Sequence, residues 1–369
     1  MAIVLGFFTF AILFWQTLKF EPLLAQIGGR QTTGQLLSFV SDSKAGKLTL
    51  SGLAGSAPAV LTALAYHRCN KSFLCILPDR ESASYFFNDL ENLMDEAGMS
   101  YEDRSIFFFP ASYKKPYETE QTDNANVLLR AEVVNRLASQ KSKIVVVSFP
   151  EAVGEKIISK SELGKNLLVA NKGEAITVDF FLDLLVEYDF ERVEFVAEPG
   201  QFSVRGGIID VFSFSNDYPF RIEVIDDTVS SLRLFDPETQ LSIKTTQKVH
   251  ILPDISRLAM ESNKRECILD SMPANTVIWC NNNDFVASKL DLGYEKAVNI
   301  FPMLHKDIKH LQPTEMFVSG KEFAALLQNK TVVEFHASQL SQNQQQLLSF
   351  RFQPQPSFNK HFNLITLQD

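Results

Sequence analysis

The sequence is poor in the residues that build disulfides and metal sites. Its 369 residues include only four cysteines, no two of which form a C-x-x-C pair: Cys69, Cys75, Cys267 and Cys280. The six histidines are scattered along the chain. We therefore expect buried, reduced thiols and no metal site, a pattern typical of a cytoplasmic protein.

Basic residues are also few. Lys and Arg total 35 against 44 Asp and Glu, which gives a formal net charge of −9. A protein that coats DNA by itself normally carries a basic balance, so this class is disfavoured. The sequence contains no G-x-G-x-x-G, G-x-S-x-G or H-E-x-x-H motif. We therefore expect no catalytic residue, and the chain is predicted not to be an enzyme by itself.

Long apolar runs are rare, and the most apolar one is residues 2–15, with the first charge at Lys19. A membrane-spanning helix needs about 20 apolar residues, and a signal peptide needs a basic start. The run satisfies neither requirement. It favours a buried or interfacial helix, or an extension from a misplaced start codon, while a membrane anchor stays an alternative.

Apolar strands alternate with helix-like segments from Lys47 to about residue 154, and the same rhythm returns after His250. The expected strands are 47–51, 72–78, 105–110, 143–150, 276–280, 315–319 and 331–335. This alternation predicts a parallel α/β sheet.

Residues 155–250 break that rhythm. Thr177 can cap a helix that runs to Tyr188, and short strands with polar turns follow at 191–197, 202–214, 219–225, 228–235 and 240–244. This pattern predicts an inserted α+β domain with antiparallel strands. We therefore divide the chain into an N-terminal extension (1–45), a first half (46–154), the insertion (155–250) and a second half with a C-terminal connector (251–369).

A nucleotide site would be expected in the loop after the first strand, because a P-loop connects a strand to a helix. The loop contains Gly52, Gly55 and Ser56, but Ala57 and Pro58 stand where glycine and lysine are needed. Without that lysine the loop is predicted to be a degenerate, non-functional P-loop.

Strand alternation in the insertion separates two faces. Phe220, Ile222 and Val224 share one face, and Arg221, Glu223 and Ile225 share the other. The same alternation turns Arg205 outward. Arginine beside exposed aliphatic surface is common in protein interfaces, although ordinary solvated strand residues would give the same pattern.

The run EPGQFSVRGGIIDVFSFSNDYPFRIEVIDDTVSSLRLFDPETQLS (198–242) resembles the UvrB-type module at the N-terminus of the transcription-repair coupling factor family. Supporting similarities include LPDRESASYFFNDLENL (77–93) and QPSFNKHFNLI (355–365), and the resemblance extends over about 46–369. It implies a RecA-like domain split by an inserted UvrA-binding domain.

The same resemblance assigns residue roles. It implies UvrA contacts by Arg205 and Arg221, and by Ile225 at a position where the family has Phe. The loop at 110–123, where UvrB has a long aromatic hairpin that clamps DNA, is short and has only Tyr113 and Tyr117. Damage verification by this chain is therefore not expected.

The predicted function is a non-catalytic, monomeric module that recruits UvrA by mimicking UvrB and so links stalled RNA polymerase to nucleotide excision repair. No cofactor is expected here. The resemblance implies that ATP and Mg²⁺ serve translocase domains of the family, and that RNA polymerase and DNA are bound through other domains; we expect none of these domains within the sequence given. The alternatives are a UvrB-like ATP-binding DNA repair helicase and a membrane-anchored interaction protein.

Overall fold

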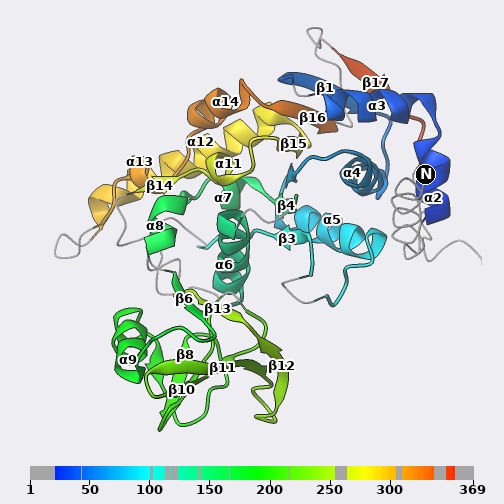
Figure 1. Ribbon diagram of the computed structural model, residues 1–369. Coiled ribbons are helices and arrows are strands. Elements are labelled where there is room, and N and C mark those ends of the chain that lie inside the picture. Colours follow the sequence, from blue (N-terminus) through cyan, green and yellow to red (C-terminus); the bar gives the residue numbers. More distant parts are fainter. Residues whose placement is uncertain are drawn as a thin grey trace, which may run out of the picture.

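A large parallel sheet surrounded by helices and a smaller sheet set apart from it make up the protein (Figure 1). The computed structural model describes residues 21–42, 44–99, 103–112, 117, 124–139, 143–165, 167–214, 216–253, 264–304, 310–335 and 346–353. The apolar run 2–15, Tyr113 and the segment 355–365 lie outside these residues.

The large sheet has seven strands, and every neighbouring pair is parallel. In spatial order they are β17 (Leu347–Ser349), β1 (Gly46–Ser51), β16 (Thr331–Phe335), β15 (Val277–Cys280), β2 (Phe73–Ile76), β4 (Val145–Ser148) and β3 (Ile106–Phe108). All residues of β2, β4, β15 and β16 are buried, as expected for parallel strands covered on both faces.

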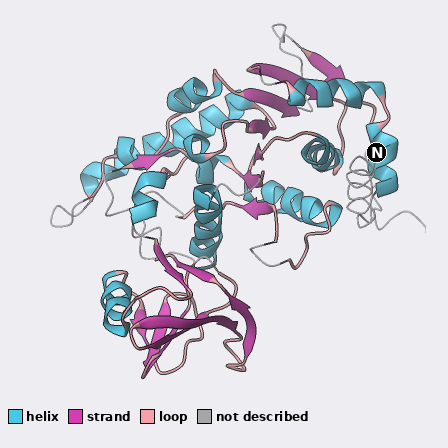
Figure 2. Ribbon diagram, in the orientation of Figure 1, coloured by secondary structure: helices cyan, strands magenta, loops and turns pink. Residues whose placement is uncertain are grey.

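Helices connect and cover these strands (Figure 2). They are α2 (Glu21–Gly28), α3 (Gln31–Ser41), α4 (Ala57–Arg68), α5 (Arg80–Leu93), α6 (Asn124–Ser139), α7 (Pro150–Val153), α8 (Lys160–Lys165), α11 (Ile268–Ser271), α12 (Asn283–Ile300), the 3₁₀ turn η1 (Phe301–Met303), α13 (Pro313–Met316) and α14 (Gly320–Leu327). Asp79, Asn282 and Ser319 cap α5, α12 and α14, because each side chain accepts a hydrogen bond from a backbone N–H in the first turn.

The N-terminal extension is partly integrated into the large core. Leu24 and Ile27 of α2 and Leu36 and Val40 of α3 are buried in the same hydrophobic cluster as the central strands. Residues 21–41 are therefore part of the folded body.

One predicted strand is wrong. Residues 315–319 do not form a strand, because Pro313 begins the short helix α13 and Glu315 closes a capping box with Gln312. Only Phe317 makes an isolated antiparallel bridge, to Glu155.

Two short antiparallel ladders mark where the chain leaves and re-enters the large body. β5 (Ile157–Ile158) pairs with β14 (Arg265–Glu266), and β6 (Leu168–Asn171) pairs with β13 (Lys248–Ile251). The outgoing and returning strands therefore lie side by side, as an insertion requires.

The smaller sheet lies between these ladders in the sequence. Its order is β12 (Ser242–Thr246), β11 (Thr228–Phe235), β10 (Phe220–Ile225), β9 (Ile208–Val211), β8 (Gln201–Arg205) and β7 (Glu191–Arg192). Neighbours are antiparallel except β7 and β8, which are parallel, and the strand expected at 191–197 stops at Arg192. The single strand expected at 202–214 is instead a hairpin: β8 and β9 pair antiparallel, and the turn between them is at Gly206 and Gly207, where Gly206 has a φ of +62°. From β8 onward the neighbouring strands are antiparallel, as predicted.

Helix α9 (Val178–Glu187) covers one face of the smaller sheet. Thr177 caps it, as predicted, and its Phe181 and Leu185 are buried against the alternate residues Phe202, Ile222 and Leu232. We call this the inner face and the opposite one the outer face. The predicted fold class, a RecA-like parallel sheet split by an α+β insertion, is confirmed, whereas the four segment boundaries stay predictions.

The structure predicts a strict requirement for glycine at position 52. Gly52 has a φ of +69°, and a Cβ there would lie 2.0 Å from the carbonyl oxygen of Phe350. Gly52→Ala should therefore lower the free energy of unfolding by more than about 2 kcal/mol. Thermal unfolding of the full chain measures this loss.

Gly55→Ala is the matched control. Gly55 also has a positive φ, +55°, but open space surrounds its Cβ position. Only the backbone penalty of roughly 1–2 kcal/mol should appear. Equal losses for the two variants would contradict the close approach of Phe350.

Candidate functional site

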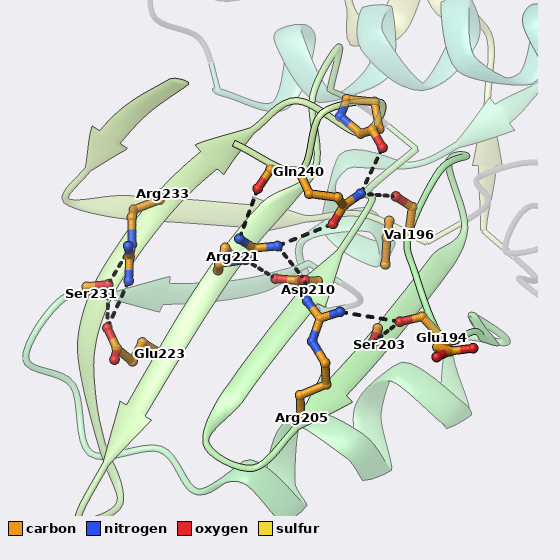
Figure 3. A network of polar contacts seen from close by, with 11 residues as sticks. Glu194, Val196, Ser203, Arg205, Asp210, Arg221, Glu223, Ser231, Arg233 and Gln240 are labelled. Carbon is orange, nitrogen blue, oxygen red and sulfur yellow. Dashed lines mark hydrogen bonds and ion pairs between the residues drawn. The ribbon is translucent and has the colours of Figure 1, made fainter. Parts of the chain in front are cut away.

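A row of polar side chains crosses the outer face of the smaller sheet (Figure 3). The strand register aligns Ser203, Asp210, Arg221 and Arg233 on four neighbouring strands. Side chains directly opposite each other in a sheet are close enough to interact, so the register places Asp210 between Ser203 and Arg221, and Arg205 lies two residues beyond Ser203 on β8.

Asp210 is the centre of this row. Its carboxylate is almost completely buried, and it accepts hydrogen bonds from Arg221 at 2.7 and 2.9 Å. Arg205 also donates to it, at 2.5 Å. One carboxylate thus serves two guanidinium groups, so the cluster keeps one net positive charge.

Arg221 lies on the predicted face but is not freely exposed. The turn at 236–240 covers it: Arg221 donates to the backbone oxygen of Gln240 at 3.2 Å and lies over the ring of Phe235 at 4.3 Å. Only 16% of its side chain is accessible. Hydrogen bonding to Asp210 raises the pKa of this guanidinium above its ordinary value, so the group is a permanent charge.

Arg205 is the accessible arginine. Its side chain is 41% exposed, and its guanidinium lies 5.3 Å from the ring centroid of Phe195. It also donates to the backbone oxygen of Glu194 at 3.5 Å. The residue therefore presents charge to solvent while being held in place on one side.

Ile225 lies at the end of β10 and is 54% exposed. The two-residue turn that follows, Asp226–Asp227, has positive φ at both positions, which is typical of a tight hairpin turn. Gly207 approaches the same strand so closely that a Cβ would lie 2.4 Å from the oxygen of Val224. Both features fix the end of β10, and with it Ile225.

The loop at 52–58 has the predicted position between β1 and α4. Pro58 lies in the first turn of α4, and the side chain of the N-cap residue Ser56 makes no capping hydrogen bond. Phe352 donates to the backbone oxygen of Gly52 at 3.0 Å. The segment that follows β17 therefore packs directly against this loop.

A cleft of about 500 Å³ adjoins this loop at the carboxyl ends of the parallel strands. Open α/β sheets bind ligands at such edges. Leucine, proline and aromatic side chains dominate its lining, and the charged residue among them is Asp89. Among the described lining residues there is no cation.

All four cysteines are buried and unpaired, and burial raises the pKa of the thiols of Cys75, Cys267 and Cys280, which disfavours a nucleophilic role. The ring of Tyr117 packs against Phe317, and its hydroxyl donates to the oxygen of Leu311.

The described residues contain neither a metal-binding cluster nor a membrane-spanning helix. In that part of the chain, no cluster of three or more His, Cys, Asp or Glu side chains could hold a metal ion. Within the same residues, no helix combines the length and apolar character needed to cross a membrane.

Sequence reasoning missed Asp210, Gln240 and Phe195. Asp210 could have been found, because it is the one charged residue in the apolar strand β9 and alternation places it on the outer face. The covering role of Gln240 and the position of Phe195 depend on how non-repetitive segments fold back over the sheet, which has no periodic signal.

Asp210 should be essential for the stability of the smaller sheet. Asp210→Asn leaves two arginines without their carboxylate, one of them mostly buried, and should lower the free energy of unfolding by about 3–5 kcal/mol. Urea unfolding followed by circular dichroism measures the effect.

Glu223→Gln provides the comparison. Glu223 pairs with Arg233 at 3.0 Å on the same face, but both side chains are about one-third exposed. Such a pair contributes at most about 1 kcal/mol. An Asp210→Asn loss no larger than the Glu223→Gln loss would contradict the central role of Asp210.

Comparisons with known proteins agree with this geometry. Residues 168–256 match the family described as the UvrB interaction domain, a range that contains α9, the six-stranded sheet and the β6–β13 ladder. Arg205, Asp210, Arg221 and Ile225 all lie within it.

Three curated relatives carry the name transcription-repair-coupling factor. The chain is 33% identical over 205 residues to the protein of Bacillus subtilis, 25% over 211 residues to that of Escherichia coli and 27% over 227 residues to that of Myxococcus xanthus. These matches cover 55–61% of this chain but only 17–19% of the relatives, so the chain spans less than a fifth of their length. The predicted resemblance is confirmed: residues 168–256 match the UvrB interaction domain, in a chain that is similar to part of the transcription-repair-coupling factors.

Proposed function

We propose that the chain is a non-catalytic module that recruits UvrA through the outer face of the smaller sheet. The observation that carries this proposal is the pairing of an accessible arginine, Arg205, with an exposed aliphatic residue, Ile225, on the domain that matches the UvrB interaction family. Arginine and apolar anchors of this kind dominate binding energy at protein interfaces.

Arg221 has a different part in this proposal. It is mostly covered by Gln240 and held by Asp210. Arg221 therefore contributes positive electrostatic potential and a fixed surface shape, and its side chain is not free to move toward a partner. Charge that is fixed before binding costs little ordering entropy when a partner arrives.

The name of the relatives supports a link between transcription and repair. In this proposal the module mimics UvrB and connects stalled RNA polymerase to nucleotide excision repair, while polymerase and DNA are bound by the parts of the relatives that this chain does not match. The proposal implies a cytoplasmic protein, because its partner works on chromosomal DNA, and it includes the expectation that the chain is a monomer.

The UvrB-like ATP-binding helicase is less well supported. Its ATP would need a cation at the loop 52–58, and the cleft there offers Asp89 instead. A carboxylate repels the phosphates that a P-loop lysine attracts.

Arg205→Ala should weaken UvrA binding by about 2 kcal/mol, or roughly thirtyfold in Kd. Isothermal titration of the full chain with purified UvrA measures this change. Arg30→Ala, which removes an exposed arginine of the large body, is the matched control and should leave Kd unchanged. Equal Kd values for wild type and Arg205→Ala would contradict the proposed surface.

ATP with Mg²⁺ should not stabilise the chain. A ligand at a hundredfold excess over its Kd stabilises a protein by about 2.7 kcal/mol, which thermal unfolding detects easily. We expect no change in Tm at millimolar ATP. A rise of several degrees that disappears with Gly55→Trp, which would fill the cleft, would revive the helicase alternative.

A further inference from the structure

Phe195 is exposed between two anchored neighbours. It belongs to the segment 193–197, which crosses the outer face after β7. On one side the backbone oxygen of Glu194 accepts hydrogen bonds from Ser203 at 2.9 Å and from Arg205 at 3.5 Å (Figure 3). On the other side Val196 is completely buried against Phe212 and Phe235.

The backbone around Phe195 is fixed further by hydrogen bonds. Val193 donates to the oxygen of Phe202 at 2.9 Å, and the backbone N–H groups of Ala197 and Glu198 both donate to the side chain of Gln201 at 3.0 Å. The segment is thus attached on both sides of Phe195. The ring nevertheless stays 57% exposed, so packing within the chain does not account for it.

Phe195 is coupled to the accessible arginine. The guanidinium of Arg205 lies 5.3 Å from the ring centroid, within the range of a cation–π contact. Asp210 and Glu194 hold the same guanidinium from other directions. Arg205 and Phe195 therefore form a preorganised pair of charge and ring on one surface.

The Phe195–Arg205 pair bears on the aromatic contact that is missing at position 225. The family resemblance places an aromatic ring at position 225, and this chain has an aliphatic side chain there. We propose that Phe195 supplies the aromatic contact to UvrA, beside Arg205, and compensates for the missing ring. The inference rests on the proposed function. It requires that the surface of UvrA has an apolar pocket for Phe195 next to an acidic group for Arg205.

The alternative is that Phe195 is an isolated exposed apolar residue, which protein surfaces commonly carry. Two observations favour the docking role: the fixed backbone on both sides and the contact with Arg205. Preorganised aromatic residues bind with little loss of side-chain entropy, which makes them effective anchors.

The test is isothermal titration of the full chain with purified UvrA. Phe195→Ala should weaken Kd at least tenfold, and Phe195→Tyr, which keeps the ring, should stay within threefold of wild type. Phe180→Ala is the matched control: Phe180 is 49% exposed on α9, which covers the inner face, and its removal should leave Kd unchanged.

A double-mutant cycle distinguishes a docking pair from independent residues. Phe195→Ala and Arg205→Ala should be non-additive, because each residue positions the other. Unchanged thermal unfolding of Phe195→Ala would show that the loss of affinity is not a loss of fold.

The outcomes are separable. Loss of binding with Arg205→Ala but not with Phe195→Ala would overturn this inference and leave the proposed function intact. Absence of binding by the wild-type chain would overturn both. Equal effects of Phe195→Ala and Phe180→Ala would show that any exposed Phe has the same influence, and the assignment of Phe195 would be wrong.

Discussion

The interleaving of the large sheet is the constraint on which the structure depends. β15 and β16 come from the end of the described chain, yet they hydrogen-bond between β1 and β2, which come from its beginning. Neither the residues before the insertion nor those after it can therefore complete this sheet alone. The roughly hundred residues between its halves must leave and return at one place, and the paired ladders β5–β14 and β6–β13 provide that place.

Within the insertion, a single buried carboxylate organises the outer face. Asp210 lies between two guanidinium groups, and the surrounding chain then divides their roles. The turn at 236–240 covers Arg221, whereas Arg205 keeps access to solvent. Burial of an ion pair is expensive unless its remaining hydrogen bonds are satisfied, and Gln240 supplies these for Arg221.

Periodic features could be predicted from the sequence. Six of the seven strands of the large sheet, the capped helix after Thr177 and the two faces of β10 follow from apolar spacing, and the missing lysine of the loop 52–58 is visible directly. The edge strand β17 was not expected, because it lies in a stretch interpreted as a C-terminal connector. The family resemblance then pointed to Arg205, Arg221 and Ile225 as contact residues.

What escaped prediction depends on contacts between distant segments. The pattern of residues 315–319 looked like a strand, but the proline and capping box before it began a helix. Alternation placed Arg205 and Arg221 on the outer face, yet it could not foresee that residues 193–197 would contact Arg205 or that the turn at 236–240 would cover Arg221. Whether a residue on the outer face is covered depends on segments that are distant in the sequence. The periodicity of a single strand carries no information about such contacts.

The same interleaving has a consequence for synthesis on the ribosome. From β8 to β12 each strand of the smaller sheet pairs with the next one along the chain, so this sheet can form as soon as its own residues emerge. β1 must wait for β16, whose first residue follows it by more than 280 positions. The nascent chain would thus carry a finished insertion while β1 still lacks both of its neighbours and β2 lacks β15, although β2, β4 and β3 can already pair with one another. In that interval β1 and the free edge of β2 are exposed to aggregation, and the smaller sheet would be complete, and able to meet another protein, before the large sheet is.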